Sequence, residues 1–364
     1  MKSVLSSLLL ILLGNSFVFS QSIITLQHNG TSSFHNLLDS AIFNSQNGDT
    51  IYLPGGVFST PIIINKSIAI VGAGHHPDST LATNFSWLSS TVKITNAASG
   101  GSISGCYLSN GITFGTNYND QGVTNYIISR CNLNGFLLAS NGADTSTCNN
   151  ILITECVIRG GVAGQFSQNV FFTNNIFNQL CASGCNLIDN MTNCLFYNNI
   201  FLHDGSAGCG GGCPPSRTLI NVKNSFFYNN IFKQNKNGTT YGNNFQTGCT
   251  GNFYKYNIFE GINSQDWFAA SANYLLNNQF SISFATLFVN QTGATYNYSN
   301  NYHLQNASSF LGEDGTQVGV YGGASPWKEG SVPFNPHIQF KNIANTTDSN
   351  GNLNINIQVG AQDH

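Results

Sequence analysis

The densest group of potentially catalytic side chains consists of Asp189, His203, Asp204 and Arg217, in the middle of the chain. An imidazole beside a carboxylate can transfer a proton at neutral pH or bind a metal ion. With Lys223 as a base, the group also offers the cations that a polysaccharide lyase uses to remove a proton next to a uronate carboxylate. Neighbouring residues of a strand point to opposite faces, so His203 and Asp204 could cooperate only on a loop.

Other arrangements of charge point to different chemistry. A glycoside hydrolase needs clustered carboxylates, whereas the Asp residues here are scattered and no Asp-Asp pair occurs. Ca²⁺ needs several converging carboxylates and is expected only with a lyase, so no cofactor is predicted otherwise. Two oppositely charged pairs, Arg130 with Glu155 and Lys233 with Glu260, occupy equivalent positions of adjacent repeats and are expected to form ion pairs on the surface.

Four of the ten cysteines form two closely spaced pairs, Cys181 with Cys185 and Cys209 with Cys213. Zinc is one interpretation, although each gap has three residues instead of the usual two. Disulfides are favoured in an exported protein, and four cysteines allow three connectivities. Cys185 and Cys209 each follow a repeated Asn by the same interval, so a bond between them is predicted.

Composition excludes several classes of protein. The chain has 364 residues, of which only 7% are charged, with a formal net charge of −3. This balance lacks the basic excess by which nucleic-acid-binding proteins neutralise phosphates. Its 27 Phe and 14 Tyr argue against disorder, and the abundance of Asn and Gly argues against a helical protein.

A repeat organises the middle of the chain. The phrases 172–177, 196–201, 227–232 and 254–259 share the pattern aromatic-x-x-Asn-Ile-Phe, with Asn in place of the second x in the first three. Aligning on the Asn before Ile gives a column whose members are Cys106, Cys131 and Cys156, followed by Asn175, Asn199, Asn230, Asn257, Asn278 and Asn301. Inward apolar residues occur two positions after and three positions before this column. The three column cysteines and Cys194, at an inward position, are expected to be buried thiols.

The spacing of this column varies between 19 and 31 residues, which suits a coil with fixed strands and variable loops. Each strand would pair in parallel with the same strand one turn later, about 4.8 Å away, and the Asn amides would hydrogen-bond in a ladder. The pattern resembles the right-handed parallel β-helix family, the fold of pectate lyases and of many secreted bacterial proteins. The resemblance covers roughly residues 48–325 and implies the fold without an activity.

The two ends of the chain depart from the repeat. Residues 1–20 have the charged start and apolar core of a signal peptide, which predicts a secreted, periplasmic or cell-surface protein. Residues 21–47 form an N-terminal cap in which 34–43 has helical spacing. Residues 326–364 form a C-terminal cap, with a β-hairpin predicted to cover the last coil. The sequence around residues 327–337 is also similar to secreted proteins of Bacteroidetes-like bacteria.

One face of the expected coil is unusually apolar. If the residues three and five positions before the column point inward, those two and four before it point outward. These outward positions, where a solvated sheet would carry polar groups, hold an aromatic set. Either long loops cover this face or it is an exposed binding stripe. The candidate binding residues are Phe171, Tyr197, Phe226, Tyr228, Phe253, Lys255 and Tyr274.

The sequence therefore predicts an all-β, right-handed parallel β-helix that binds polysaccharide or another surface polymer along its aromatic face without catalysis. It is expected to be a monomer that neither binds nucleic acid nor spans a membrane. Two alternatives remain: a lyase or glycoside hydrolase acting on an acidic glycan through the charged group, and a structural adhesin or envelope component. Convergence of the charged side chains would favour the enzyme, and an uncovered aromatic row would favour binding.

Overall fold

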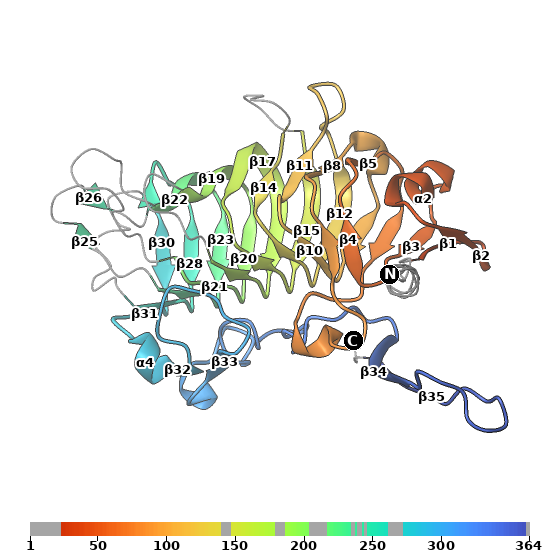
Figure 1. Ribbon diagram of the computed structural model, residues 1–364. Coiled ribbons are helices and arrows are strands. Elements are labelled where there is room, and N and C mark those ends of the chain that lie inside the picture. Colours follow the sequence, from red (N-terminus) through yellow and green to blue (C-terminus); the bar gives the residue numbers. More distant parts are fainter. Residues whose placement is uncertain are drawn as a thin grey trace, which may run out of the picture.

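The chain winds into a right-handed parallel β-helix, which confirms the predicted fold (Figure 1). The computed structural model describes residues 23–139, 147–178, 186–203, 217–233, 237–238, 242–243, 246–260 and 272–361. Parallel pairs join each strand to the equivalent strand of the next coil, from β3 (Thr50–Tyr52) and β6 (Ala69–Val71) to β29 (Ile258–Phe259) and β31 (Gln279–Phe280). A right-handed crossover is the rule for such parallel connections.

Each coil contributes strands to three rows. The first row forms one side of a 19-stranded sheet. Its members are β3, β6, β9 (Ser102–Ser104), β12 (Thr124–Ser129), β15 (Asn149–Thr154), β17 (Val162–Thr173), β20 (Leu195–Tyr197), β23 (Phe226–Tyr228), β28 (Phe253–Lys255) and β30 (Tyr274–Leu276). We call the outward side of this row the aromatic face.

The second row is a separate 10-stranded sheet. Its members are β4 (Gly56–Phe58), β7 (Ser86–Leu88), β10 (Cys106–Leu108), β13 (Asn132–Leu133), β16 (Val157–Ile158), β18 (Ile176–Phe177), β21 (Ile200–Phe201), β24 (Ile231–Phe232), β29 and β31. The third row joins the first through the long β17, and these two rows together with β1 (Ile24–His28) and β2 (Thr31–His35) make up the 19-stranded sheet. It contains β5 (Ile62–Ile64), β8 (Val92–Ile94), β11 (Ile112–Phe114), β14 (Phe136–Leu137), β19 (Asn186–Thr192), β22 (Arg217–Lys223) and β27 (Gln246–Thr247).

A column of bends joins the first row to the second. The bend residue has a backbone φ between 50° and 64° in eight successive coils, in the left-handed region that Asn and Gly tolerate best. This bend column consists of Gly105, Arg130, Glu155, Asn174, Asn198, Asn229, Tyr256 and Asn277. Asn therefore recurs here for a conformational reason, and the side chains of the column point away from the core.

The residue after each bend belongs to the predicted ladder. The side chains of Asn175, Asn199, Asn230, Asn257 and Asn278 bond in sequence, each Nδ2 donating to the next Oδ1 at 2.9–3.0 Å. Each ladder Oδ1 after the first also accepts the backbone N–H of the preceding ladder residue at 2.9 Å. The cysteines continue this column toward the N-terminus, since the N–H of Cys156 donates to Asn175 Oδ1. Buried polar groups that would otherwise lack partners are thus satisfied.

Asn301 does not belong to the ladder, contrary to the prediction. It is exposed and lies in β33 (Asn301–Leu304), which pairs antiparallel with β32 (Phe288–Asn290) outside the coils. The spacing of the repeat continues to this point in the sequence, but parallel pairing ends at β31.

Aromatic rings fill the interior in two stacks. Phe177, Phe201, Phe232, Phe259 and Phe280 lie with centroids 4.4–5.2 Å apart and planes within 12° of parallel. Phe172, Phe196, Phe227 and Tyr254 form the second stack at 4.6–5.0 Å. The one-coil spacing of the strands imposes this stacking.

The N-terminal end is capped by the antiparallel pair β1 (Ile24–His28) and β2 (Thr31–His35) and by α2 (Leu38–Asn44). The helix buries Leu38, Ala41 and Ile42 against the first coils. It is shorter than predicted, because Phe34 lies in β2 and its side chain is exposed.

Residues 281–334, which we call the strap, run back from the last coil along the 10-stranded sheet (Figure 1). The strap contains α4 (Phe284–Leu287), β32, β33 and the 3₁₀ turn η3 (Ala307–Ser309). It covers the outward apolar residues of the sheet, which form a second buried cluster with Phe284, Leu287 and Trp327. The covered residues are Val157, Ile176, Ile200, Ile231 and Ile258. The strap thus removes the outward residues of this sheet from solvent.

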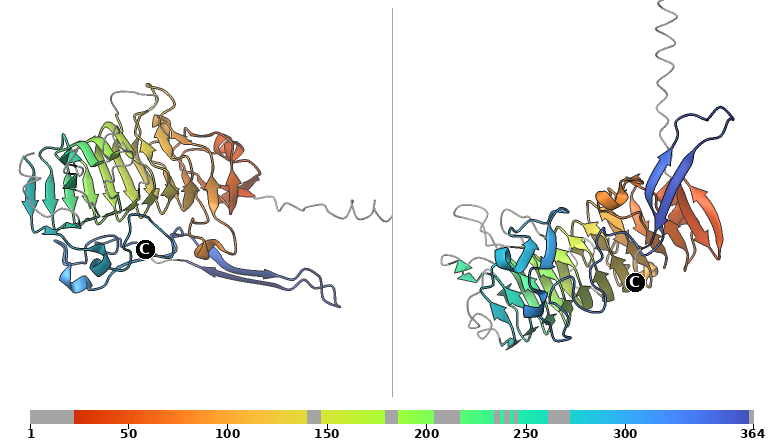
Figure 2. Two further views of the ribbon diagram at one scale, coloured as in Figure 1. Left: turned by 60° about the vertical axis from the view of Figure 1, so that its left-hand side comes forward. Right: turned by 90° about the horizontal axis from the view of Figure 1, so that it is seen from below.

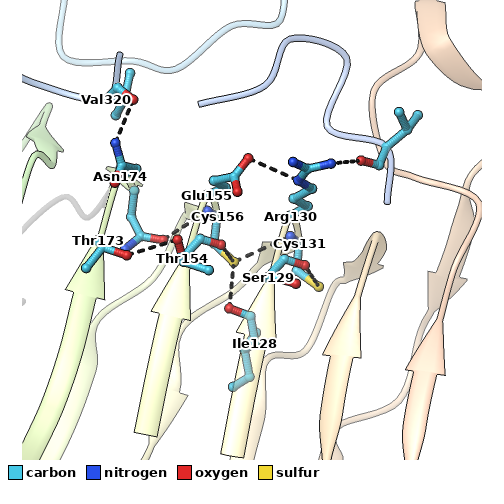
Figure 3. A network of polar contacts seen from close by, with 12 residues as sticks. Ile128, Ser129, Arg130, Cys131, Thr154, Glu155, Cys156, Thr173, Asn174 and Val320 are labelled. Atoms are coloured by element: carbon cyan, nitrogen blue, oxygen red, sulfur yellow. Dashed lines mark hydrogen bonds and ion pairs between the residues drawn. The ribbon is translucent and has the colours of Figure 1, made fainter. Parts of the chain in front are cut away.

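Two ion pairs attach the strap to the coils. Both pairs were expected on the open surface, but the structure buries them largely. Arg130 Nε donates to Glu155 Oε2 at 3.0 Å, and both side chains are less than 7% exposed. Figure 3 shows this pair of Arg130 and Glu155. Arg130 also donates to Val332 O at 2.8 Å and lies over the ring of Phe334. Burial raises the pKa of the Glu155 carboxyl.

The second pair joins Lys233 Nζ to Glu260 Oε2 at 2.7 Å. Lys233 Nζ also donates to Thr292 O, and Glu260 Oε1 accepts the N–H of Phe284. Charges that the repeat places side by side thus hold the strap against the coils.

The predicted C-terminal hairpin is present as β34 (His337–Ile343) and β35 (Ile355–Gly360). It does not cover the last coil. It lies at the N-terminal end of the β-helix, where His337, Ile338 and Lys341 face Thr25 and Tyr52 across a hollow, and it projects away from the coils (Figure 2). The strap carries the chain back to this end, which explains the difference.

Candidate functional site

The aromatic face is exposed over part of its length. Period-two alternation turns Phe226, Phe253 and Tyr274 outward, and their side chains are 38%, 39% and 61% exposed. Phe171 and Leu195 continue the same column half-buried, and no described segment closes over its exposed part. The face thus keeps an open apolar row.

The rings of this row stack on one another. Phe226 and Phe253 have centroids 5.3 Å apart, and Phe253 and Tyr274 are 4.6 Å apart, with planes within 21° of parallel. Each ring therefore covers the flat face of its neighbour. The edges of the rings remain for a ligand, and a sugar ring cannot stack on the flat faces that lie between neighbouring rings of the row.

A groove of about 370 Å³ lies between this row and the parallel outward column that contains Tyr228, Lys255 and Leu276. Tyr228 lies beside Phe226 in an edge-to-face contact at 5.7 Å. A groove with apolar walls and a few polar groups is a usual form of ligand site.

Strap residues supply the polar margin of the groove. Glu313 pairs with Lys255 Nζ, and Asp314 Oδ2 accepts the hydroxyl of Tyr197 at 2.7 Å. The bond to Glu313 raises the pKa of Lys255, and burial together with Asp314 raises the pKa of Tyr197. Lys255 therefore stays an ammonium and Tyr197 a neutral hydroxyl donor.

Glu313 and Asp314 were not among the site residues predicted from the sequence. They occupy a turn between Gly312 and Gly315, with no repeat to relate them to the coils. The only available signal was two adjacent carboxylates in a chain with few charges.

Among the described residues, the structure does not bring the predicted catalytic side chains of β19 and β22 into register. Asp189 in β19 lies opposite Ile220, whereas Arg217 lies opposite Asn186 and Lys223 opposite Thr192. Three residues along a strand correspond to about 10 Å, so neither cation is in register with the carboxylate. Burial raises the pKa of Asp189, which accepts only a long 3.2 Å bond from Gly164 N–H among its described contacts.

His203 is buried and follows β21 of the second row. Asp204 lies outside the described residues. Within the described ranges, His, Cys, Asp and Glu side chains nowhere gather in a group of three that could hold a metal ion.

The cysteines divide into two groups. Cys106, Cys131, Cys156 and Cys194 are buried thiols that form no disulfide, as their inward positions indicated. Cys148 and Cys249 are also buried free thiols. The predicted disulfide residues Cys181, Cys185, Cys209 and Cys213 lie outside the described residues, so their pairing stays a prediction.

Comparisons with known proteins give only distant likenesses. No protein-family model matches the chain, and no curated protein matches it. A glycoside hydrolase structure aligns with 64% of this chain at 10% identity and a TM-score of 0.34, and the match spans about half of that protein.

A tailspike protein of an Acinetobacter baumannii bacteriophage, a capsular polysaccharide depolymerase, aligns with 67% of this chain at 10% identity, with a TM-score of 0.29 over 52% of its own length. PfbA, a surface adhesin of Streptococcus pneumoniae, gives 12% identity over 67% of this chain and 86% of its own, with a TM-score of 0.21. At these TM-scores the likenesses carry no argument about function. No helix in the described part of the chain is long and apolar enough to cross a membrane.

Proposed function

We propose that this protein is a secreted or cell-surface β-helix that binds an extended polysaccharide along its aromatic face without catalysis. The open row formed by Phe226, Phe253 and Tyr274, with the adjoining groove, carries the proposal. Contiguous exposed apolar patches of this kind mark interaction sites. Secretion rests on the predicted signal peptide at residues 1–20, which lies outside the described residues.

The geometry suits a polymer better than a small compact ligand. The row and the groove span three successive coils, so equivalent contacts recur about 4.8 Å apart along the axis of the coils. A chain of sugar rings lying in the groove would place its apolar C–H faces against the edges of Phe253 and Tyr274. Its hydroxyls would meet the polar margin formed by Tyr228, Lys255 and Glu313.

Charge at the margin indicates a polymer that is not strongly anionic. Lys255 is already paired with Glu313, and Asp314 adds a second carboxylate beside Tyr197. A polyuronate would therefore meet one neutralised cation and an additional negative charge. The dispersed positions of Asp189, Arg217 and Lys223 also give no support to chemistry on an acidic glycan.

Alanine substitution of Phe253 tests the proposal, with polysaccharide affinity measured by affinity electrophoresis and isothermal titration calorimetry on a panel of neutral, amino and acidic glycans. Loss of a central ring should weaken binding about tenfold, since aromatic contacts contribute about 1 kcal/mol or more. Phe166→Ala is the matched control, because Phe166 is 53% exposed but lies in β17 outside the row. Circular dichroism checks the fold.

Two results would refute the proposal. The first is that no glycan of the panel binds the native protein. The second is that Phe166→Ala weakens binding as much as Phe253→Ala. New absorbance at 235 nm on a uronate glycan would show elimination chemistry and so contradict a role without catalysis.

A further inference from the structure

A second cleft, of about 460 Å³, lies where the strap meets the first coils, on a side of the molecule other than the aromatic face. One side is the connection after β6, which contains His76 and the 3₁₀ turn η1 (Asp78–Thr80). The other side consists of strap residues, and Ile176 of the covered sheet lies at its base. Tyr296, Tyr298, Tyr302, Tyr321, Trp327 and Glu329 line the strap side.

Hydrogen bonds hold the Tyr298 wall of this cleft in place. Asn132 Nδ2 donates to the Tyr298 hydroxyl at 2.7 Å, and His75 Nδ1 lies 3.0 Å from the same oxygen. Burial lowers the pKa of His75 to about 3, so the imidazole is neutral. The Tyr298 hydroxyl thus bonds to Asn132 and to the neutral His75 ring, and its hydrogen-bonding groups are already satisfied inside the wall of the cleft.

Further aromatic contacts stabilise the remaining walls. His76 meets Tyr298 edge to face at 4.8 Å, and Tyr296 stacks on Tyr302 at 5.6 Å. Tyr321 stacks on His303 at 3.7 Å. The strap and the coils together thus form an aromatic site whose walls do not depend on a ligand.

The charge of this cleft is negative. Its lining includes the exposed carboxylates of Asp78 and Glu329 and, among the described residues, neither Lys nor Arg. Arg159 lies behind the Tyr298 wall, where it donates to Asn132 Oδ1 at 2.6 Å and lies over Tyr107. Its positive charge offsets one of the two carboxylates and leaves the other in excess. Glu329 Oε1 lies 3.7 Å from His303 Nδ1 and 3.5 Å from the Tyr321 hydroxyl.

We propose that this cleft binds a sugar unit that carries a free amino group. The π-faces of Tyr and Trp attract an ammonium group, and carboxylates at the rim add attraction and hydrogen-bond acceptors. Uronates would be repelled by the same carboxylates. The proposal uses neither the groove nor the aromatic row, so it stands independently of the function proposed above.

Isothermal titration calorimetry with three tetrasaccharides tests the proposed amino-sugar site. The three are the glucosamine tetramer, its fully N-acetylated form and the galacturonate tetramer. We expect the free-amine tetramer to bind about tenfold more tightly than the acetylated one, with affinity that falls as salt is added. The double substitution Asp78→Asn and Glu329→Gln keeps the size of both side chains and should abolish this preference. Asp39→Asn, at an exposed carboxylate of α2, is the matched control and should leave it unchanged.

Phe253→Ala separates this proposal from the previous one, since it should weaken polymer binding and leave the tetramer affinity unchanged. The cleft proposal is overturned if no tetramer binds, if the acetylated or uronate tetramer binds as tightly as the free amine, or if the double variant retains the preference. Loss of tetramer binding in Phe253→Ala would also overturn it, because the ligand would then occupy the groove.

Discussion

The Asn ladder makes a quantitative prediction at Asn230. This residue is fully buried, and its Oδ1 accepts both the backbone N–H and Nδ2 of Asn199. Its Nδ2 donates to Phe196 O at 2.9 Å and to Asn257 Oδ1 at 3.0 Å. We predict that Asn230→Ala destabilises the protein strongly without changing its fold.

The magnitude follows from the group that loses every partner. The N–H of Asn199 loses the bond described above. Phe196 O keeps its place in the parallel ladder between β20 and β23, Asn199 Nδ2 keeps its bond to Phe172 O, and Asn257 Oδ1 keeps the N–H of residue 230. One stranded buried group at about 1–3 kcal/mol gives a loss of roughly 2 kcal/mol. For a chain of this length that corresponds to a Tm lower by roughly 3 °C.

Asn278→Ala is the matched comparison, because Asn278 ends the ladder and its contacts are only partly buried. Water can replace the amide there, so we expect a loss of only about 1 kcal/mol. Guanidinium denaturation followed by circular dichroism measures both variants. Equal losses at the two positions, or a loss below about 1 kcal/mol at Asn230, would refute the ladder as a major source of stability.

Two further predictions concern buried charge. Arg130→Met should cost about 3–5 kcal/mol in denaturant unfolding, because it leaves Glu155 buried without its cation. Replacing both residues with Met should recover most of that loss, and an equally unstable double variant would contradict this explanation. His75 has a pKa of about 3 in the folded protein, so only the unfolded state gains a proton between about pH 6.5 and 3. Stability should therefore fall with acidification by up to about 1.4 kcal/mol per pH unit, and His75→Gln should flatten the dependence measured by urea unfolding at pH 7, 5 and 4.

The fold could be predicted from the sequence because its determinants repeat locally. Asn175, Asn199 and Asn230 recur with the same neighbours, and one amide on the next is the only arrangement that satisfies each of them. The outward aromatic row followed from strand alternation for the same reason. The repeat also placed Arg130 beside Glu155, although it could not show that another segment buries the pair.

The strap, the position of the hairpin and the margin of the groove could not be predicted, because they depend on contacts without a period. Arg130 reaches Val332 across 202 residues, and Tyr296 N–H reaches Asn178 Oδ1 across 118. No spacing within the strap sequence indicates these partners. Asn301 shows that spacing alone can also mislead. Its position in the sequence continues the repeat, but its strand β33 lies outside the coils.

The strap also has a consequence for biosynthesis. Coils of a solenoid contact mainly their neighbours and can form one after another as the chain emerges from the ribosome. The isoleucines from Ile176 to Ile258 must nevertheless stay uncovered until residues 281–334 have been made. The nascent chain therefore passes through a stage with a long apolar stripe open to solvent, in which association with other chains or with a holding chaperone competes with completion of the fold.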